Sequence, residues 1–148
     1  DNSKELIRIL KRNVSMLRME SEIPKNDTPL DMLIKAAQSA GIEVDITGQM
    51  PELEDVNQLF FEAATEALTN AVRHADAKKL CIWLSEDDKT YSVCFTNDGN
   101  QPQEEIAEGG GLGTLRQKTE RIGGAMELLY QPGFVLKLTV LKKRGNNL

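Results

Sequence analysis

Two short stretches of alternating apolar and polar residues stand next to each other near the middle of this chain, and they constrain its fold most. Residues 80–85 and 91–97 each have the pattern of a half-buried β-strand, and only a short polar segment separates them. Strands joined so closely pair as an antiparallel hairpin. A tight turn would pair Leu80 with Phe95, Ile82 with Val93 and Leu84 with Tyr91, which places these six side chains on one face of the sheet.

Helical patterns surround this hairpin. Residues 51–75 are predicted to form a long helix that Pro51 opens, and its apolar side chains recur at helical spacing. The other predicted elements are helices at 28–41 and 112–122 and strands at 42–46, 125–131 and 134–141. Because helices stand between antiparallel strand pairs, we predict an α+β fold, a two-layer α/β sandwich. Its mixed, mostly antiparallel sheet would be covered on one face by helices.

The length of 148 residues predicts a single domain, which we place at 23–144. Residues 1–22 are predicted to be a helical tail, either the end of a longer dimerisation helix or a helix packed on its own domain. Residues 145–148 are expected to fray. The net charge of −5 argues against a nucleic-acid partner, and neither a signal peptide nor a membrane-spanning run is expected. Cys81 and Cys94 are predicted to face each other across the hairpin as reduced, small core residues.

A line of polar residues follows one side of the long helix. Glu62, Glu66, Asn70 and Arg73 recur at spacings of four, four and three. A solvated helix face explains the acids equally well, but Asn is a poor residue for a helix interior. A side-chain carbonyl at Asn70 is a suitable ligand for Mg²⁺, which takes oxygen ligands and few protein groups.

Two further motifs have an ordinary explanation when each is taken alone. Residues 109–113 contain four glycines and lead into a helix, which suits phosphate binding by backbone N–H groups but also suits a flexible loop before a helix. Asn97-Asp98-Gly99 follows the second hairpin strand, where a simple turn is expected. Alternation places Asn97 toward the helices and Asp98 away from them.

Taken together and in this order, the three motifs resemble a known family. Glu66-x-x-x-Asn70-x-x-Arg73-His74, then Asn97-Asp98-Gly99, then Gly109-x-Gly111-Leu112-Gly113 are similar to the N box and the glycine boxes of histidine-kinase ATPase domains. The sequence of residues 67–75, around Asn70, looks most like that of nitrate-sensor-type two-component sensor kinases. The resemblance covers about residues 28–141 and implies the Bergerat-type ATP-binding fold of the gyrase, chaperone, histidine-kinase and mismatch-repair ATPases.

The resemblance also implies a role for each matching residue. Glu66 would be the catalytic acid that polarises the nucleophile, and Asn70 would hold Mg²⁺. The residues implied to bind ATP, the N-box and glycine-box positions, are Asn70, Arg73, His74, Asn97, Gly99, Gly109, Gly111, Leu112 and Gly113. The implied partners are a dimerisation and histidine-phosphotransfer domain of the same protein, and a response regulator. The implied parent is a homodimer at the cell membrane, with this domain in the cytoplasm.

Several positions depart from the family pattern. Asn97 stands where the family has the Asp that accepts a hydrogen bond from adenine, so we expect weaker adenine binding; Asp98 would serve only if the strand slipped by one residue. Phe134 stands where the family commonly has Thr, and it either packs against the base or fills part of the pocket. His74, the only histidine, lies inside the N box, so the phospho-accepting histidine is expected outside this chain. Asn97 and Phe134 leave open the alternative of a kinase-inactive nucleotide-sensing or docking module. An anti-sigma-factor-type serine kinase on the same fold is a second alternative, against which the sequence of the N box argues.

Overall fold

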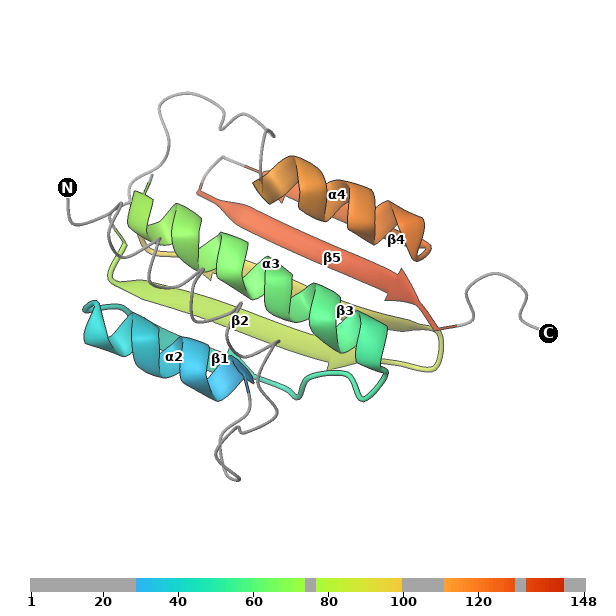
Figure 1. Ribbon diagram of the computed structural model, residues 1–148, viewed down its shortest axis with the longest axis horizontal. Coiled ribbons are helices and arrows are strands. Elements are labelled where there is room, and N and C mark those ends of the chain that lie inside the picture. The colour runs from blue at the N-terminus through green and yellow to red at the C-terminus, as the bar shows by residue number, and fades with distance from the viewer. Residues whose placement is uncertain (1–28, 74–76, 100–110, 130–132, 143–148) are drawn as a thin grey trace.

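The computed structural model describes residues 29–73, 77–99, 111–129 and 133–142, which form a five-stranded mixed sheet with helices on one face (Figure 1). The elements follow one another as α2 (Pro29–Ser39), β1 (Glu43–Thr47), α3 (Glu54–Arg73), β2 (Lys79–Glu86), β3 (Thr90–Asn97), α4 (Gly111–Arg121), β4 (Gly124–Leu129) and β5 (Val135–Leu141). The strand order is β1-β2-β3-β5-β4, in which β1 is parallel to β2 and every other pair is antiparallel. The predicted α+β sandwich is confirmed. The predicted tail at 1–22 and the predicted fraying of 145–148 lie outside the described residues.

The core lies between α3 and the sheet. Apolar side chains of α3 recur at helical spacing and meet the inward side chains of β2, β3 and β5. The side chains of Phe60 on α3 and Phe95 on β3 are both almost fully buried. Burial of each aromatic ring stabilises the fold by about 2–3 kcal/mol. Others in this core are Val56, Ala63, Ala67, Ile82, Val93, Leu138 and Val140. This packing fixes α3 along the middle of the sheet (Figure 1).

The predicted register of the β2–β3 hairpin is wrong by two residues. Leu80 pairs with Asn97, and Phe95 pairs with Ile82. The turn explains the difference, because Asp87 Oδ1 accepts hydrogen bonds of 2.8 Å from the backbone N–H groups of Lys89 and Thr90. These bonds close the turn around residues 88 and 89, which shifts every pair along the hairpin. A shift of two residues leaves each side chain on its predicted face.

The face of the sheet away from the helices carries both cysteines. Cys81 pairs with Thr96 and Cys94 pairs with Trp83, so the predicted pairing of the two cysteines is wrong. Both are free thiols and half-buried rather than core residues. Burial raises the pKa of the Cys94 thiol. Trp83 is 45% exposed on the same face. Alternation along the strands therefore separates a packed face from an open one.

Helix α3 begins three residues later than predicted. Pro51 is buried ahead of the helix, and its carbonyl oxygen accepts a 3.0 Å hydrogen bond from the side-chain amide of Asn57. The first backbone bond of the helix runs from Asn57 N to Leu53 O.

Among the described residues, no helix combines the length and the apolar character that a bilayer crossing requires.

Helix α4 is fixed over the edge strand β4. Leu112 and Leu115 on its inner side are 4% and 2% exposed. Arg116 Nη1 donates a 2.9 Å hydrogen bond to the Met126 carbonyl oxygen of β4. This bond pairs a backbone carbonyl group at the edge of the sheet. Unpaired carbonyl groups at a sheet edge can otherwise form hydrogen bonds with a strand of another molecule. The packing holds the N-terminus of α4 close to the second half of α3.

Candidate functional site

Asn70 is a buried polar residue in the last turns of α3. This residue is 6% exposed, and its buried Nδ2 has no hydrogen-bond partner among the residues that the structure describes. The neighbouring buried hydroxyls behave differently, because Thr65 donates to Phe61 O and Thr69 donates to Thr65 O. A buried donor without an acceptor destabilises a protein by about 1–3 kcal/mol. An unpartnered amide at this position indicates a polar group that binds there.

Asn97 is half-buried and has a second side-chain Nδ2 that is buried. It is the last residue of β3, and its Oδ1 accepts a 2.9 Å hydrogen bond from the backbone N–H of Gly99. Because a backbone N–H can only donate, the side-chain atom that faces Gly99 must be the carbonyl oxygen Oδ1. The Nδ2 atom of Asn97 therefore points away from Gly99. That Nδ2 is buried and has no partner in the part of the chain that the structure describes.

Both asparagines lie at the same end of the molecule. Asn97 pairs with Leu80, so β3 ends where β2 begins. The chain just before β2 is tied back to the last turns of α3, because Ala77 N donates a 3.0 Å hydrogen bond to Ala71 O. Figure 1 shows the C-terminal end of α3, the end of β3 and the start of β5 at this side. The fold therefore brings together two of the three motifs.

The glycine box reaches the same end through α4. Gly111 opens α4 and lies so close to Glu66 that a Cβ atom there would collide with the carboxylate. The free backbone N–H groups of a helix N-terminus attract anions, and Glu66 stands beside them. The Leu112 side chain is a core residue, so only its backbone is available to a ligand. Gly113 follows half-buried, and Gly109 lies outside the described residues.

Asp98 has a local structural role. Its side chain is exposed, and Oδ1 accepts 2.9 Å hydrogen bonds from the backbone N–H groups of Lys78 and Lys79. These bonds hold the pKa of the Asp98 carboxyl below its ordinary value. Asn97 pairs with Leu80, so the register differs from the predicted one by two residues rather than by one. An even shift keeps Asn97 on the helix side, and Asp98 does not replace it there.

Phe134 is a core residue. It immediately precedes β5, and its side chain is 4% exposed within the main apolar cluster. This burial favours the interpretation that Phe134 fills part of the space at this end of the sheet. The side chain of Arg73, and His74 as a whole, lie outside the described residues, so their predicted roles stay predictions.

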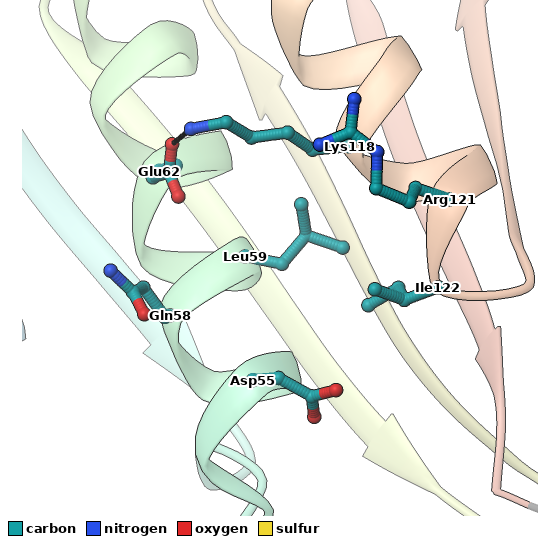
Figure 2. A pocket seen from close by; sticks show the side chains of 7 residues that line it. All are labelled: Asp55, Gln58, Leu59, Glu62, Lys118, Arg121 and Ile122. Carbon is teal, nitrogen blue, oxygen red and sulfur yellow. Dashed lines mark hydrogen bonds and ion pairs between the residues drawn. The ribbon is translucent and has the colours of Figure 1, made fainter.

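A separate groove of about 260 Å³ lies between the first half of α3 and the second half of α4 (Figure 2). Lys118 Nζ bridges it with a 2.6 Å ion pair to Glu62 Oε1. None of the predicted site residues lines this groove, and Glu62 stands about two helical turns before Asn70. The polar line predicted along α3 therefore divides, because Glu62 contacts α4 while Asn70 is buried. The residues around the groove are Asp55, Gln58, Leu59, Glu62, Lys118, Arg121 and Ile122.

Sequence reasoning missed two of these features. Lys118 is 56 positions from Glu62, and no local pattern indicates that they pair. The engaged carbonyl of Asn97 was also missed, although an Asn two residues before a Gly is a known signal for a side-chain-capped turn. Among the described residues, no group of three or more His, Cys, Asp or Glu side chains could hold a metal ion.

The likenesses to known proteins agree with this geometry. No family model matches the chain. The sensor histidine kinase YxjM of Bacillus subtilis (strain 168) is 33% identical over 72 residues, which are 49% of this chain and 18% of that protein. The chain thus spans less than a fifth of the length of that relative.

The likeness among solved structures covers most of the chain. The histidine kinase domain from the Erythrobacter litoralis EL346 blue-light activated histidine kinase matches 93% of this chain and 74% of its own, with a TM-score of 0.62 and 17% identity. The fold is that of histidine kinase ATP-binding domains. The ATP binding domain of PrrB from Mycobacterium tuberculosis matches 75% of this chain and 91% of its own, with a TM-score of 0.52 and 21% identity. The histidine kinase AdeS of Acinetobacter baumannii gives a TM-score of 0.56 at 14% identity over 93% of this chain and 76% of its own. The predicted resemblance to this group is confirmed.

Proposed function

We propose that this chain is the ATP-binding catalytic domain of a sensor histidine kinase and that it positions Mg²⁺-ATP for phosphoryl transfer. One observation carries the proposal. The side-chain Nδ2 atoms of Asn70 and Asn97 are buried at the end of the fold where α4 begins, and neither has a hydrogen-bond partner among the described residues. The fold and the sensor kinase relative support the same conclusion.

The described residues fit a magnesium-bound nucleotide. Mg²⁺ keeps several waters and is bound through a few protein oxygens together with phosphate groups. The side chain of Asn70 supplies one such oxygen, and its burial against the core keeps it in place. Bound Mg²⁺ would neutralise charge on the phosphates. The backbone N–H groups at the start of α4, from Gly111 to Gly113, would bind phosphate oxygens.

Glu66 is the proposed catalytic residue. Its carboxylate lies against Gly111 at the start of α4, next to the proposed phosphate positions. In phosphoryl transfer the protein contributes mainly positioning and electrostatic stabilisation, and an acidic residue orients the nucleophile. Glu66 would accept the proton of the attacking imidazole. Arg73, His74, Gly99 and Gly109 are further proposed nucleotide contacts, on the strength of the family resemblance.

The acceptor histidine is proposed to belong to another domain. His74 is the only histidine of the chain, and it follows Asn70 by four positions in the motif whose residues are proposed to contact the nucleotide. We therefore propose as the partner a dimerisation and phosphotransfer domain whose acceptor histidine lies outside this chain. The parent would be a homodimeric membrane sensor, and a response regulator would receive the phosphoryl group.

A variant that separates binding from transfer tests this function. Glu66→Gln keeps the size of the side chain and one acceptor oxygen but removes its charge and basicity. In the complete kinase, radiolabelled ATP should label a histidine in the wild type, whereas Glu66→Gln should bind ADP normally and label far more slowly. Equal labelling of the two proteins would contradict the role of Glu66. The absence of any labelled histidine in the wild type would contradict the kinase function.

A further inference from the structure

We propose that Asn97 determines which purines the nucleotide site accepts, and that its free amide donor admits 6-oxo purine nucleotides, those of inosine and guanosine. The inference rests on the proposed function, because it assumes that a nucleotide base lies at the end of β3. It goes beyond that function, since it assigns base selection to one side chain and extends the substrate class.

The orientation of the Asn97 amide is fixed by its neighbour. Gly99 N donates to Oδ1 at 2.9 Å, and rotating the amide by half a turn would place Nδ2 against that N–H. Two donors would then face each other, and one hydrogen bond would be lost. The amide therefore keeps one orientation, with Nδ2 directed away from Gly99. A buried Nδ2 in a fixed orientation requires an acceptor from whatever binds.

Purines differ in what they offer this donor. The 6-amino group of adenine donates hydrogen bonds, whereas the 6-carbonyl of hypoxanthine or guanine accepts them. Nδ2 of Asn97 therefore matches a 6-oxo purine directly. Adenine is still tolerated, because its ring nitrogen can accept from Nδ2 and Oδ1 retains a second lone pair for the amino group. A carboxylate at this position has only acceptors, so it accepts from the N1–H of a 6-oxo purine but loses the hydrogen bond to the 6-carbonyl oxygen that Nδ2 of Asn97 donates.

The adjacent carboxylate does not provide the missing selectivity. Asp98 is exposed on the far side of the strand end, and its Oδ1 is already bonded to two backbone N–H groups of β2. Asn97 alternates with Phe95 and faces the helices. At the end of β3, within the part of the chain that is described, the polar side chain available to a base is therefore Asn97.

Calorimetric titration with ADP, IDP and GDP in the presence of Mg²⁺ tests the proposal. IDP isolates the effect of the 6-carbonyl, since it lacks the 2-amino group of guanine. In the wild type, the affinities for ADP and IDP should lie within a few-fold of each other. Asn97→Asp should tighten ADP and weaken IDP, and so raise the ratio of the two affinities by about tenfold or more.

Thr96→Asp provides the matched control. It adds the same charge one residue earlier, on the open face of the sheet, where Thr96 pairs with Cys81. This variant should lower the affinities for ADP and IDP by the same factor and leave their ratio unchanged. Circular dichroism spectra like that of the wild type would show that both variants fold.

Two results would overturn the proposal and leave the proposed function intact. In one, wild-type protein binds ADP more than about tenfold tighter than IDP, which means that the free donor does not select. In the other, Asn97→Asp leaves the ratio of ADP to IDP affinity unchanged, which means that Asn97 does not face the base. If no nucleotide binds the wild type, the proposed function fails, and the inference fails with it.

Discussion

Replacement of Asn70 by alanine should separate stability from binding. The substitution removes an amide whose buried Nδ2 has no partner among the described residues, which relieves about 1–3 kcal/mol of desolvation. Alanine also favours a helix interior over asparagine by about 0.5 kcal/mol. The lost packing of three side-chain atoms opposes these gains by about 1–2 kcal/mol. We therefore expect the free energy of unfolding to stay the same or to rise by about 1 kcal/mol.

Asn57→Ala is the matched control on the same helix. Asn57 has an amide too, but its Nδ2 donates a 3.0 Å hydrogen bond to Pro51 O. Loss of this bond should lower the free energy of unfolding by about 1 kcal/mol. Asn57 stands near the start of α3, far along the helix from Asn70, so nucleotide affinity should not change.

Urea unfolding and calorimetric binding of ADP with Mg²⁺ measure the two quantities separately. Asn70→Ala should unfold at the wild-type urea concentration or above it and should lose Mg²⁺-dependent binding. Asn57→Ala should show the opposite pattern. If Asn70→Ala loses as much stability as Asn57→Ala, the Asn70 amide has a structural partner. If it binds ADP with Mg²⁺ like the wild type, Asn70 is not the metal ligand.

Two further predictions concern the ends of α4 and β3. Gly111→Ala should leave the free energy of unfolding within about 1 kcal/mol of the wild type, because its Cβ would displace only the carboxylate end of the flexible Glu66 side chain, and it should slow phosphoryl transfer because that carboxylate moves. Gly133→Ala, whose Cβ meets no neighbour, should match the wild type in stability and in transfer, and equal transfer rates for the two variants would contradict the placement of Glu66. Hydrogen bonds from two backbone N–H groups lower the pKa of the Asp98 carboxyl in the folded state. The ionised carboxylate therefore stabilises the fold at pH values above its unfolded pKa of about 3.9. This stabilisation is lost as the pH falls through the folded pKa. Asp98→Ala should therefore be less stable than the wild type at neutral pH and nearly equal to it in strong acid, whereas a gap that does not depend on pH would refute the linkage.

The sequence predicted the elements well because each has a clear period. The alternation in β2 and β3 and the helical spacing in α3 identified both the elements and their buried faces. The hairpin register was not predictable from alternation, since a shift of two residues preserves every face. The side chain of Asp87 determines it by capping the turn, and nothing in the apolar pattern reports that bond.

For the candidate site, the sequence predicted the face of the sheet on which Asn97 lies but not the hydrogen bonds of its side chain. Alternation indicated that Asn97 faces the helices, yet only the structure shows that Gly99 N–H engages its carbonyl oxygen. Burial of Phe134 depends on how β5 packs against the rest of the sheet, which its neighbours in sequence do not reveal. Local patterns identify elements and faces, whereas long-range packing decides which polar atoms remain available to a ligand.

The central claim is that this chain binds a magnesium nucleotide through the end of the fold that holds Asn70 and Asn97. Calorimetric titration of the wild-type chain with ADP and a non-hydrolysable ATP analogue, with and without Mg²⁺, tests it most directly. We expect the wild-type chain to bind these nucleotides in the micromolar to low-millimolar range, and only in the presence of Mg²⁺. No binding at millimolar nucleotide under either condition would contradict it and would favour a docking module that keeps the fold but has lost the nucleotide site.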